Sequence, residues 1–265
     1  MRIALAVEYA GTAFHGWQSQ PDGNTVQDAL ERALAAIAGV AVGALAAGRT
    51  DAGVHATMQI VHFDAPVSRP DTAWVRGVNA NLPADIAVQW ARPVAADFHA
   101  RFSAHTRHYS YVLANRAVRP ALLAGRVGWY HRPLDVEAMV RAAEPLAGTH
   151  DFSAFRAAEC QARSPVKTLA PIAILAQGEF VRFDFSANAF LHHMVRNIVG
   201  ALVAVGAGKA PESAIAVLLA GRDRTRSAPT FAPDGLYLTG ADYDAKWALP
   251  VTLRPLQFPL GARSR

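Results

Sequence analysis

Cysteine and long apolar runs are scarce or missing in this sequence of 265 residues. Its single cysteine, Cys160, excludes an internal disulfide and a cysteine metal cluster, and it favours a reducing compartment. No apolar run reaches the roughly 20 residues that span a bilayer. Glu8 interrupts the apolar N-terminal stretch too early for a signal peptide. We therefore expect a cytoplasmic protein with no membrane segment.

Lysine is also rare, although the chain is basic. Of the 26 basic residues only Lys167, Lys209 and Lys246 are lysines, and the formal net charge is +5. A basic excess suits a polyanionic partner, and the planar guanidinium of arginine suits phosphates and stacked bases. Because a GC-rich coding sequence would also favour arginine over lysine, the net charge is the better indication of a nucleic-acid partner.

Several catalytic motifs are absent. There is no Gly-x-Ser-x-Gly elbow for a serine hydrolase and no His-x-x-x-His pair for a metal. His192 and His193 are adjacent, so on a helix they would diverge by about 100°. Cys160 is interpreted as a buried, small apolar group, because no histidine is near it in sequence. We therefore expect no metal site.

Apolar residues make up 52% of the chain, which is typical of a folded protein. In the first half, alternating apolar residues predict strands at 3–9, 58–63 and 86–90, the first with one buried face. Thr25 and Asp28 form a capping-box pattern that begins a helix, and this helix ends at Gly39. A short helix is expected near 74–78.

In the second half, basic and aromatic residues occur together from Phe98 to Leu113. Further on, the pattern predicts a helix at 134–148, a hairpin at 172–185, a long helix at 189–205, a short helix at 211–219 and a last strand at 236–238.

This order of elements favours the α+β class, with two α/β halves forming a joint, mainly antiparallel sheet flanked by helices. The predicted organisation is an N-terminal half with the Asp51 loop, an arginine-rich connecting segment, a C-terminal half and a tail. Their ranges are 1–115, 116–133, 134–248 and 249–265.

The stretch Gly48-Arg49-Thr50-Asp51-Ala52-Gly53-Val54-His55 is a candidate for catalysis. It places one carboxylate between two glycines and has neither helical nor strand periodicity, which is typical of a loop. An Asp in such a turn often only bonds its own backbone. The alternative is a carboxylate that acts as a nucleophile.

Arg196 is a second candidate, within the apolar pattern of 188–200. An arginine here is either a surface group on an amphipathic helix or a cation turned inward. In the second case it would pair with a carboxylate and keep that acid ionised.

Five separated motifs resemble the bacterial tRNA pseudouridine synthase A family, in order and over roughly residues 2–243. They are Phe14-His15-Gly16-Trp17-Gln18, GRTDAGVHA around Asp51, Arg107-His108-Tyr109, Phe155-Arg156 with Cys160 and Arg163-Ser164-Pro165-Val166, and Leu191 to Gly200. Ala10 stands where an acidic residue is common in the family, and the tail after Tyr243 carries no strong motif.

The resemblance implies a pseudouridine synthase fold with a central cleft and an isomerase that needs neither metal nor cofactor. Its substrate would be uridine at positions 38, 39 and 40 in the tRNA anticodon stem-loop, and a homodimer would be the working form. Asp51 would be the nucleophile on a flipped-out uridine, Tyr109 would pack against the base, Arg49 would help displace it, and Arg196 would be the basic partner of Asp51.

A non-catalytic tRNA-binding protein is the alternative function. It would share the basic charge and the aromatic residues, but it would not need Asp51. A variant without this carboxylate therefore separates the two functions.

Overall fold

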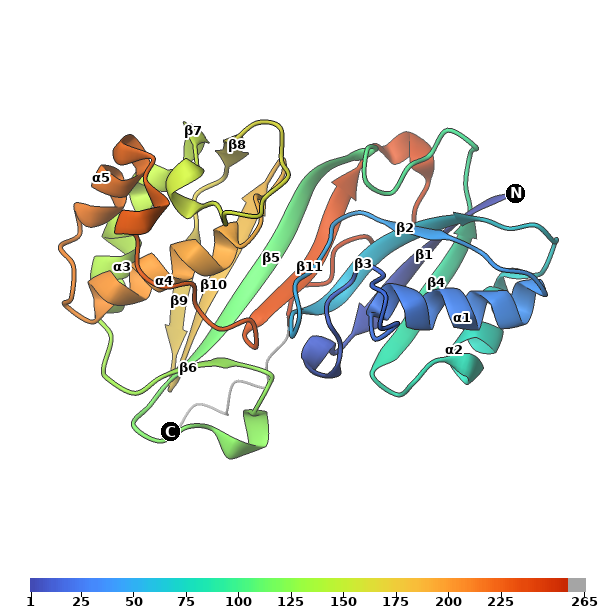
Figure 1. Ribbon diagram of the computed structural model, residues 1–265, viewed down its shortest axis with the longest axis horizontal. Helices are drawn as coiled ribbons and strands as arrows, with labels where there is room; N and C mark the ends of the chain where they lie inside the picture. The colour runs from blue at the N-terminus through green and yellow to red at the C-terminus, as the bar shows by residue number, and fades with distance from the viewer. Residues whose placement is uncertain (257–265) are drawn as a thin grey trace. The chain divides into compact units, whose positions relative to one another are not determined.

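The computed structural model describes residues 1–256, which divide into two compact units (Figure 1). Unit 1 comprises Met1–Arg107 and Tyr237–Leu256, and unit 2 comprises His108–Leu236. The boundaries between the units thus fall within strands, after Arg107 and after Leu236. The sequence boundaries expected at 115, 133 and 248 stay predictions, and the predicted tail beyond residue 256 lies outside the described residues.

The strands of unit 1 are paired mostly in antiparallel fashion. Strand β1 (Arg2–Tyr9) lies between β3 (His55–Asp64) and β4 (Ile86–Pro93), and both neighbours run antiparallel to it. The short β2 (Ala44–Ala46) also pairs with β3. On β3, Tyr237 and Leu238 of β11 (Leu236–Tyr243) add a short parallel pairing beside His55 and Ala56.

The first helix, α1 (Val26–Ala38), begins and ends where the sequence indicates. The backbone N–H of Asp28 donates to the Thr25 hydroxyl, and the Thr25 hydroxyl donates to the Asp28 carboxylate, which is the reciprocal pattern of a capping box. Gly39 ends the helix with a φ of 78°, a left-handed conformation that glycine adopts without a steric penalty. Helix α2 (Val78–Asn81) lies beside α1 in Figure 1 and follows the single π-helical turn Ala73–Gly77.

Strand β1 is buried on both faces, whereas the sequence pattern predicts one buried face. Residues 3–7 all have no exposed surface. On one face, Ala4 and Ala6 belong to a cluster of apolar side chains that contains Phe98 and is partly covered by Trp247. The prediction was wrong because this cover comes from distant parts of the chain, Tyr243 and Trp247 among them, which the local alternation of β1 cannot reveal.

His62 of β3 is a buried titratable group whose ring meets that of Phe98 edge to face. Its Nδ1 accepts a hydrogen bond from the backbone N–H of Ala100 at 3.1 Å, and its ring lies 4.6 Å from that of His99. Burial is the main cause that lowers the pKa of His62 to about 4, and the nearby His99 and Arg2 charges act in the same direction. Unprotonated His62 is therefore the form that the folded protein requires.

We predict an acid-dependent loss of stability from His62. Its unfolded pKa is about 6.5, so the unfolded chain takes up a proton between that pH and about 4 while the folded protein does not. The free energy of unfolding should fall over this window by up to about 3 kcal/mol. Thermal melting of the wild type and His62→Gln between pH 7.5 and 4.5 measures the effect. Equal slopes against pH would show that another group is responsible.

Unit 2 contains a second, mainly antiparallel set of strands. Strand β10 (Phe180–Ala187) pairs with β9 (Ala173–Gln177) through the predicted hairpin, in which Gly178 has a φ of 57°. Strand β8 (Val166–Leu169) joins β10 to β7 (Gly148–Asp151). The remaining strands are β5 (Ala104–Asn115), which runs from unit 1 into unit 2, and β6 (Gly128–Tyr130), which pairs parallel with it.

Three helices accompany these strands in unit 2 (Figure 1). They are α3 (Val136–Ala143), α4 (Met194–Gly206) and α5 (Ala214–Gly221). Helix α3 begins at the expected point, because the Asp135 side chain accepts from the backbone N–H of Ala138 at 2.9 Å. The prediction of a helix from residue 189 was wrong for its first five residues. His193 has a φ of 61°, so its backbone cannot continue a right-handed helix backwards.

Both units combine helices with mixed, mostly antiparallel strands, which confirms the predicted α+β class. Among residues 1–256, no helix has the length and apolarity that a membrane span requires.

Candidate active site

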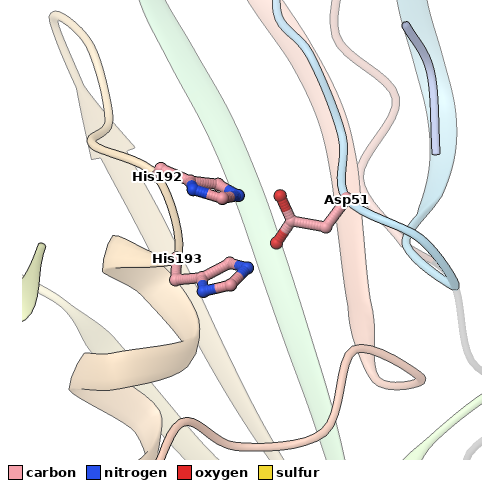
Figure 2. A group of neighbouring side chains, drawn as sticks. All are labelled: Asp51, His192 and His193. Carbon is pink, nitrogen blue, oxygen red and sulfur yellow. The ribbon is translucent and has the colours of Figure 1, made fainter. Parts of the chain in front are cut away.

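The Asp51 loop lies between β2 and β3 in unit 1, before the strand that the sequence predicts at 58–63, and Figure 2 shows its carboxylate as sticks. Burial alternates along the loop: Arg49 is exposed, Thr50 is buried and Asp51 is half-buried. The backbone N–H of Val54 donates to the Asp51 carbonyl at 3.1 Å, which closes a turn around the acid. Arg49 and Asp51 are therefore presented by one short loop with a buried anchor between them.

This anchor is a polar contact below the loop, which we call the Thr50 clamp (Tyr9, Gly48, Thr50 and Gln59). The hydroxyls of Tyr9 and Thr50 are 2.8 Å apart, and the Gln59 amide donates to the Gly48 carbonyl at 2.6 Å. Burial raises the pKa of Tyr9, so its hydroxyl stays protonated at neutral pH. Both β1 and β3 thus hold the loop on which Asp51 lies.

A β-bulge lies beside the clamp. In the β1–β3 register Val7 faces Gln59 but Tyr9 faces Ala56, so β3 contains one more residue than β1 over this interval. Bulges bend a strand and re-aim its side chains, and they are frequent next to active sites. Here the irregularity separates the two β3 residues nearest the loop, His55 and Ala56, from the regular ladder that follows.

The segment after β1 encloses the Asp51 loop from another side. The backbone N–H of Trp17 donates to the Thr50 carbonyl at 3.0 Å, and that of Gly11 donates to Nδ1 of His55 at 3.0 Å. A Cβ atom on Gly16 would lie 2.6 Å from the Thr50 carbonyl oxygen, closer than real side chains come. Gly16 also has a φ of 87°. Glycine is therefore required where this segment crosses the loop.

Tyr109, the predicted base-packing residue, lies on the part of β5 that belongs to unit 2. Its side chain is buried, and its ring meets that of Phe190 edge to face, with centroids 5.0 Å apart. This packing restricts the ring orientation, because edge-to-face contacts are favoured for aromatic pairs. Tyr109 is thus a fixed aromatic side chain within unit 2.

Arg196 lies in the first turn of α4 and is half-buried. Its Nε donates to the Phe231 carbonyl at 2.9 Å, and the Phe231 N–H donates back to the Arg196 carbonyl at 3.2 Å. The guanidinium is therefore oriented by the protein and does not simply extend into solvent. Its pairing with a carboxylate stays a prediction.

The neighbour of Arg196, Asn197, fixes the same helical turn and was not predicted to matter. It is fully buried, and its amide donates to the Phe155 carbonyl at 2.8 Å. Its carbonyl oxygen accepts from Arg224 at 3.0 Å and from Thr230 at 2.7 Å. These partners lie tens of residues away in sequence, so local pattern could not have indicated them.

His192 and His193 precede α4 and are drawn in Figure 2. The expectation that they diverge was wrong, because they do not lie on a helix and their ring centroids are 3.9 Å apart. Two imidazoles fall short of the four ligands of a structural zinc site, so this pair alone defines no metal centre.

Cys160 is buried, as expected, but it is more than an apolar group. Its Sγ accepts from the His192 backbone N–H at 3.3 Å, while the Ala157 N–H donates to the His192 carbonyl at 3.0 Å. Burial acts to raise the pKa of Cys160, yet backbone hydrogen bonds from His192 and Ala162 and the Arg156 guanidinium bring it below its usual value. Cys160 thus helps to hold the turn that precedes α4.

Comparison with known proteins identifies the family of this fold. A family model described as tRNA pseudouridine synthase matches residues 5–103 and 142–244. The chain belongs to the tRNA pseudouridine synthase family. Proteins named tRNA pseudouridine synthase A are similar to it over most of both chains. The one from Dechloromonas aromatica is 62% identical over 94% of this chain and 95% of its own. The one from Chromobacterium violaceum is 63% identical over 94% and 96%, and that from Methylobacillus flagellatus is 59% identical over 97% and 98%.

The family match covers part of the candidate site. The matched ranges include the Asp51 loop with Arg49, and they include Arg196 of α4. Tyr109 lies in the interval that the family model leaves unmatched, although the relatives cover at least 94% of the chain. The resemblance inferred from the sequence is thereby confirmed for the family.

Proposed function

We propose that this protein converts uridine to pseudouridine at positions 38, 39 and 40 in the anticodon stem-loop of tRNA. The observation that carries the proposal is the Asp51 loop, a half-buried carboxylate on a rigidly anchored glycine-bounded turn, in a member of the tRNA pseudouridine synthase family. Family membership supports the reaction type, and the resemblance of the five motifs supports the positions.

Isomerisation of uridine to pseudouridine requires a nucleophile and a pocket that retains the detached base. The bond from ribose C1′ to uracil N1 breaks, a bond from C1′ to C5 forms, C5 loses a proton and N1 gains one. We assign the nucleophile to Asp51, because a fixed carboxylate matches this need. Attack at C1′, attack at C6 and removal of the C2′ proton all use the same side chain, and the sequence and fold favour none of them.

Reaching a uridine inside a paired stem requires base extrusion, which costs a few kcal/mol. We assign Arg49 to displacement of the target base, because this exposed guanidinium lies two residues from the carboxylate on the same loop. Tyr109 supplies an aromatic surface for the extruded base, since its ring is held by Phe190. Arg196 supplies the cation that favours the ionised form of Asp51.

The substrate and the assembly belong to the same proposal. The net charge of +5 and the arginine-rich segments 101–107, 116–132 and 222–226 suit the phosphates of tRNA. We further propose a homodimer as the working form, on the strength of the motif resemblance, and a cytoplasmic location, where tRNA substrates are available and a single free thiol stays reduced.

Nucleotide-resolution mapping of pseudouridine tests this function. A tRNA transcript with uridines at 38, 39 and 40 should be modified at those positions and not in the TΨC loop. Changing each of the three to cytidine in turn should remove only the signal at that position. A chelator such as EDTA should leave the rate unchanged. Modification confined to other positions would contradict the assignment of the substrate region.

A further inference from the structure

Phe102 is a large apolar side chain that the fold leaves in solvent. Its exposed fraction is 75%, and it lies in the segment 99–103 between β4 and β5 in unit 1. The reaction proposed above does not use it. An exposed single apolar residue is common in proteins, so the surroundings of the ring decide whether the exposure has a purpose.

The backbone around Phe102 is unusually well fixed. Nδ1 of His99 accepts from the backbone N–H groups of Arg101 at 3.1 Å and of Phe102 at 3.3 Å. The His99 N–H donates to the Ser103 hydroxyl at 3.0 Å, and the Ser103 N–H donates to the His99 carbonyl at 2.8 Å. With the bond from Ala100 to His62, five successive N–H groups have acceptors. The exposure of Phe102 therefore belongs to a defined conformation.

The Arg107 side chain also holds the segment 99–103 in place. Its guanidinium donates to the carbonyls of Arg101 and Ala104, and also to the Ala47 carbonyl at 3.4 Å. Ala47 directly precedes Gly48, the first residue of the Asp51 loop. The segment that presents Phe102 is thereby joined to the loop that presents the proposed nucleophile.

Aromatic and cationic groups surround the exposed ring. The ring centroid of His99 lies 4.3 Å away with the planes tilted by 34°, and the Arg101 guanidinium carbon lies 5.6 Å from the Phe102 centroid. Burial chiefly lowers the pKa of His99, which favours the neutral imidazole that accepts the backbone hydrogen bonds of Arg101 and Phe102. Arg101 and His105 are both exposed beside the ring in sequence.

We propose that Phe102 is a stacking platform for an unpaired base of the tRNA substrate, with Arg101 contacting a phosphate of the same strand. This inference rests on the proposed function for the identity of the RNA. A fixed, exposed ring with an adjacent guanidinium is how proteins hold unstacked bases, because every base has a face to stack and a charged backbone beside it. A protein partner would instead need a contiguous apolar patch, whereas the close neighbours of this ring are polar.

Four variants test the platform by binding of a tRNA transcript. Stacking on one aromatic ring is worth about 1–3 kcal/mol per base, so Phe102→Ala should weaken binding by roughly 5-fold to 150-fold. Phe102→Leu keeps apolar volume without the ring and should lose as much, whereas Phe102→Trp should bind nearly as well as the wild type. Val40→Ala, at another exposed apolar residue of unit 1, should change nothing.

The salt dependence of binding separates the two parts of the proposal. Removing a ring displaces no counterion, so Phe102→Ala should keep the slope of log K against log salt. Arg101→Gln should reduce that slope by about one, as expected for one lost phosphate contact. Phe102→Ala should lower kcat/KM for the tRNA more than kcat, because the platform contacts a base other than the reacting one.

Three results would overturn the proposal. Wild-type affinity in Phe102→Ala or in Phe102→Leu would show that no base stacks on the ring. An altered sedimentation coefficient of free Phe102→Ala would show that the ring contacts a second copy of the chain. If the proposed function is wrong, the wild type will form no pseudouridine at positions 38–40. A loss of tRNA affinity that depends on the Phe102 ring would still support the platform.

Discussion

Replacing Asp51 with alanine or asparagine should abolish pseudouridine formation while tRNA binding is retained. Loss of a catalytic nucleophile lowers turnover by several orders of magnitude, about a millionfold in the best-studied serine protease. Binding should survive because phosphate contacts supply most of the affinity for nucleic acid. Pseudouridine mapping and a binding assay with the same tRNA transcript measure the two quantities separately.

The matched control for Asp51 is Ala52→Ser, an exposed residue of the same loop. It should behave as the wild type, because it changes neither the carboxylate nor the Thr50 clamp. If Asp51→Ala still forms pseudouridine at the wild-type rate, the loop is only a turn. The protein would then be better described by the alternative function, a tRNA-binding protein that needs no carboxylate here.

Removing the guanidinium of Arg196 should nearly abolish turnover and leave the fold largely intact. Loss of one oriented charge in an active site costs roughly 100-fold to 1,000-fold in rate. The lost hydrogen bond to the Phe231 carbonyl should cost only about 1 kcal/mol of stability. Single-turnover kinetics and thermal melting of Arg196→Ala, with Arg196→Lys beside it, test this expectation.

The two Arg196 variants distinguish charge from geometry. Lysine keeps the positive charge but lacks the planar fork of donors, so Arg196→Lys should recover part of the rate if the charge is what matters. Melting of Arg196→Ala near room temperature would make the effect structural, and the assignment of Arg196 to the reaction would then be wrong.

The elements that the sequence predicts well are those set by neighbouring residues. The start of α1 depends on Thr25 and Asp28, three residues apart, and that of α3 depends on Asp135. The β9–β10 hairpin depends on the turn at Gly178. Such local chemistry operates in the same way in any fold, which is why these predictions were confirmed.

The features that the sequence does not reveal depend on distant partners. The second buried face of β1 is covered in part by Trp247, more than two hundred residues away. The left-handed backbone of His193 shortens α4, although the sequence pattern predicts a helix from residue 189. In each case tertiary contacts outweigh local propensity.

The candidate site also contains residues that the sequence indicates and contacts that it does not. Asp51 and Arg49 stand out in the sequence because glycines bound their loop. The Thr50 clamp does not stand out, because Tyr9 and Thr50 are 41 residues apart and each is an ordinary strand or loop residue by itself. Candidate catalytic side chains can thus be proposed from the sequence, whereas the contacts that orient them are visible only in the folded structure.

The pairing of β11 with β3 has a consequence for synthesis on the ribosome. The Asp51 loop leads into His55, whose ring stacks on Tyr237 with centroids 4.6 Å apart, and Tyr237 is among the last residues of unit 1 to be made. At roughly 5–20 residues per second, translation from Arg107 to Tyr237 takes on the order of ten seconds. During this interval the His55 end of β3 lacks its parallel neighbour, although every partner of the Thr50 clamp has already been made. The strand end that follows the Asp51 loop therefore reaches its final pairing only near the end of translation.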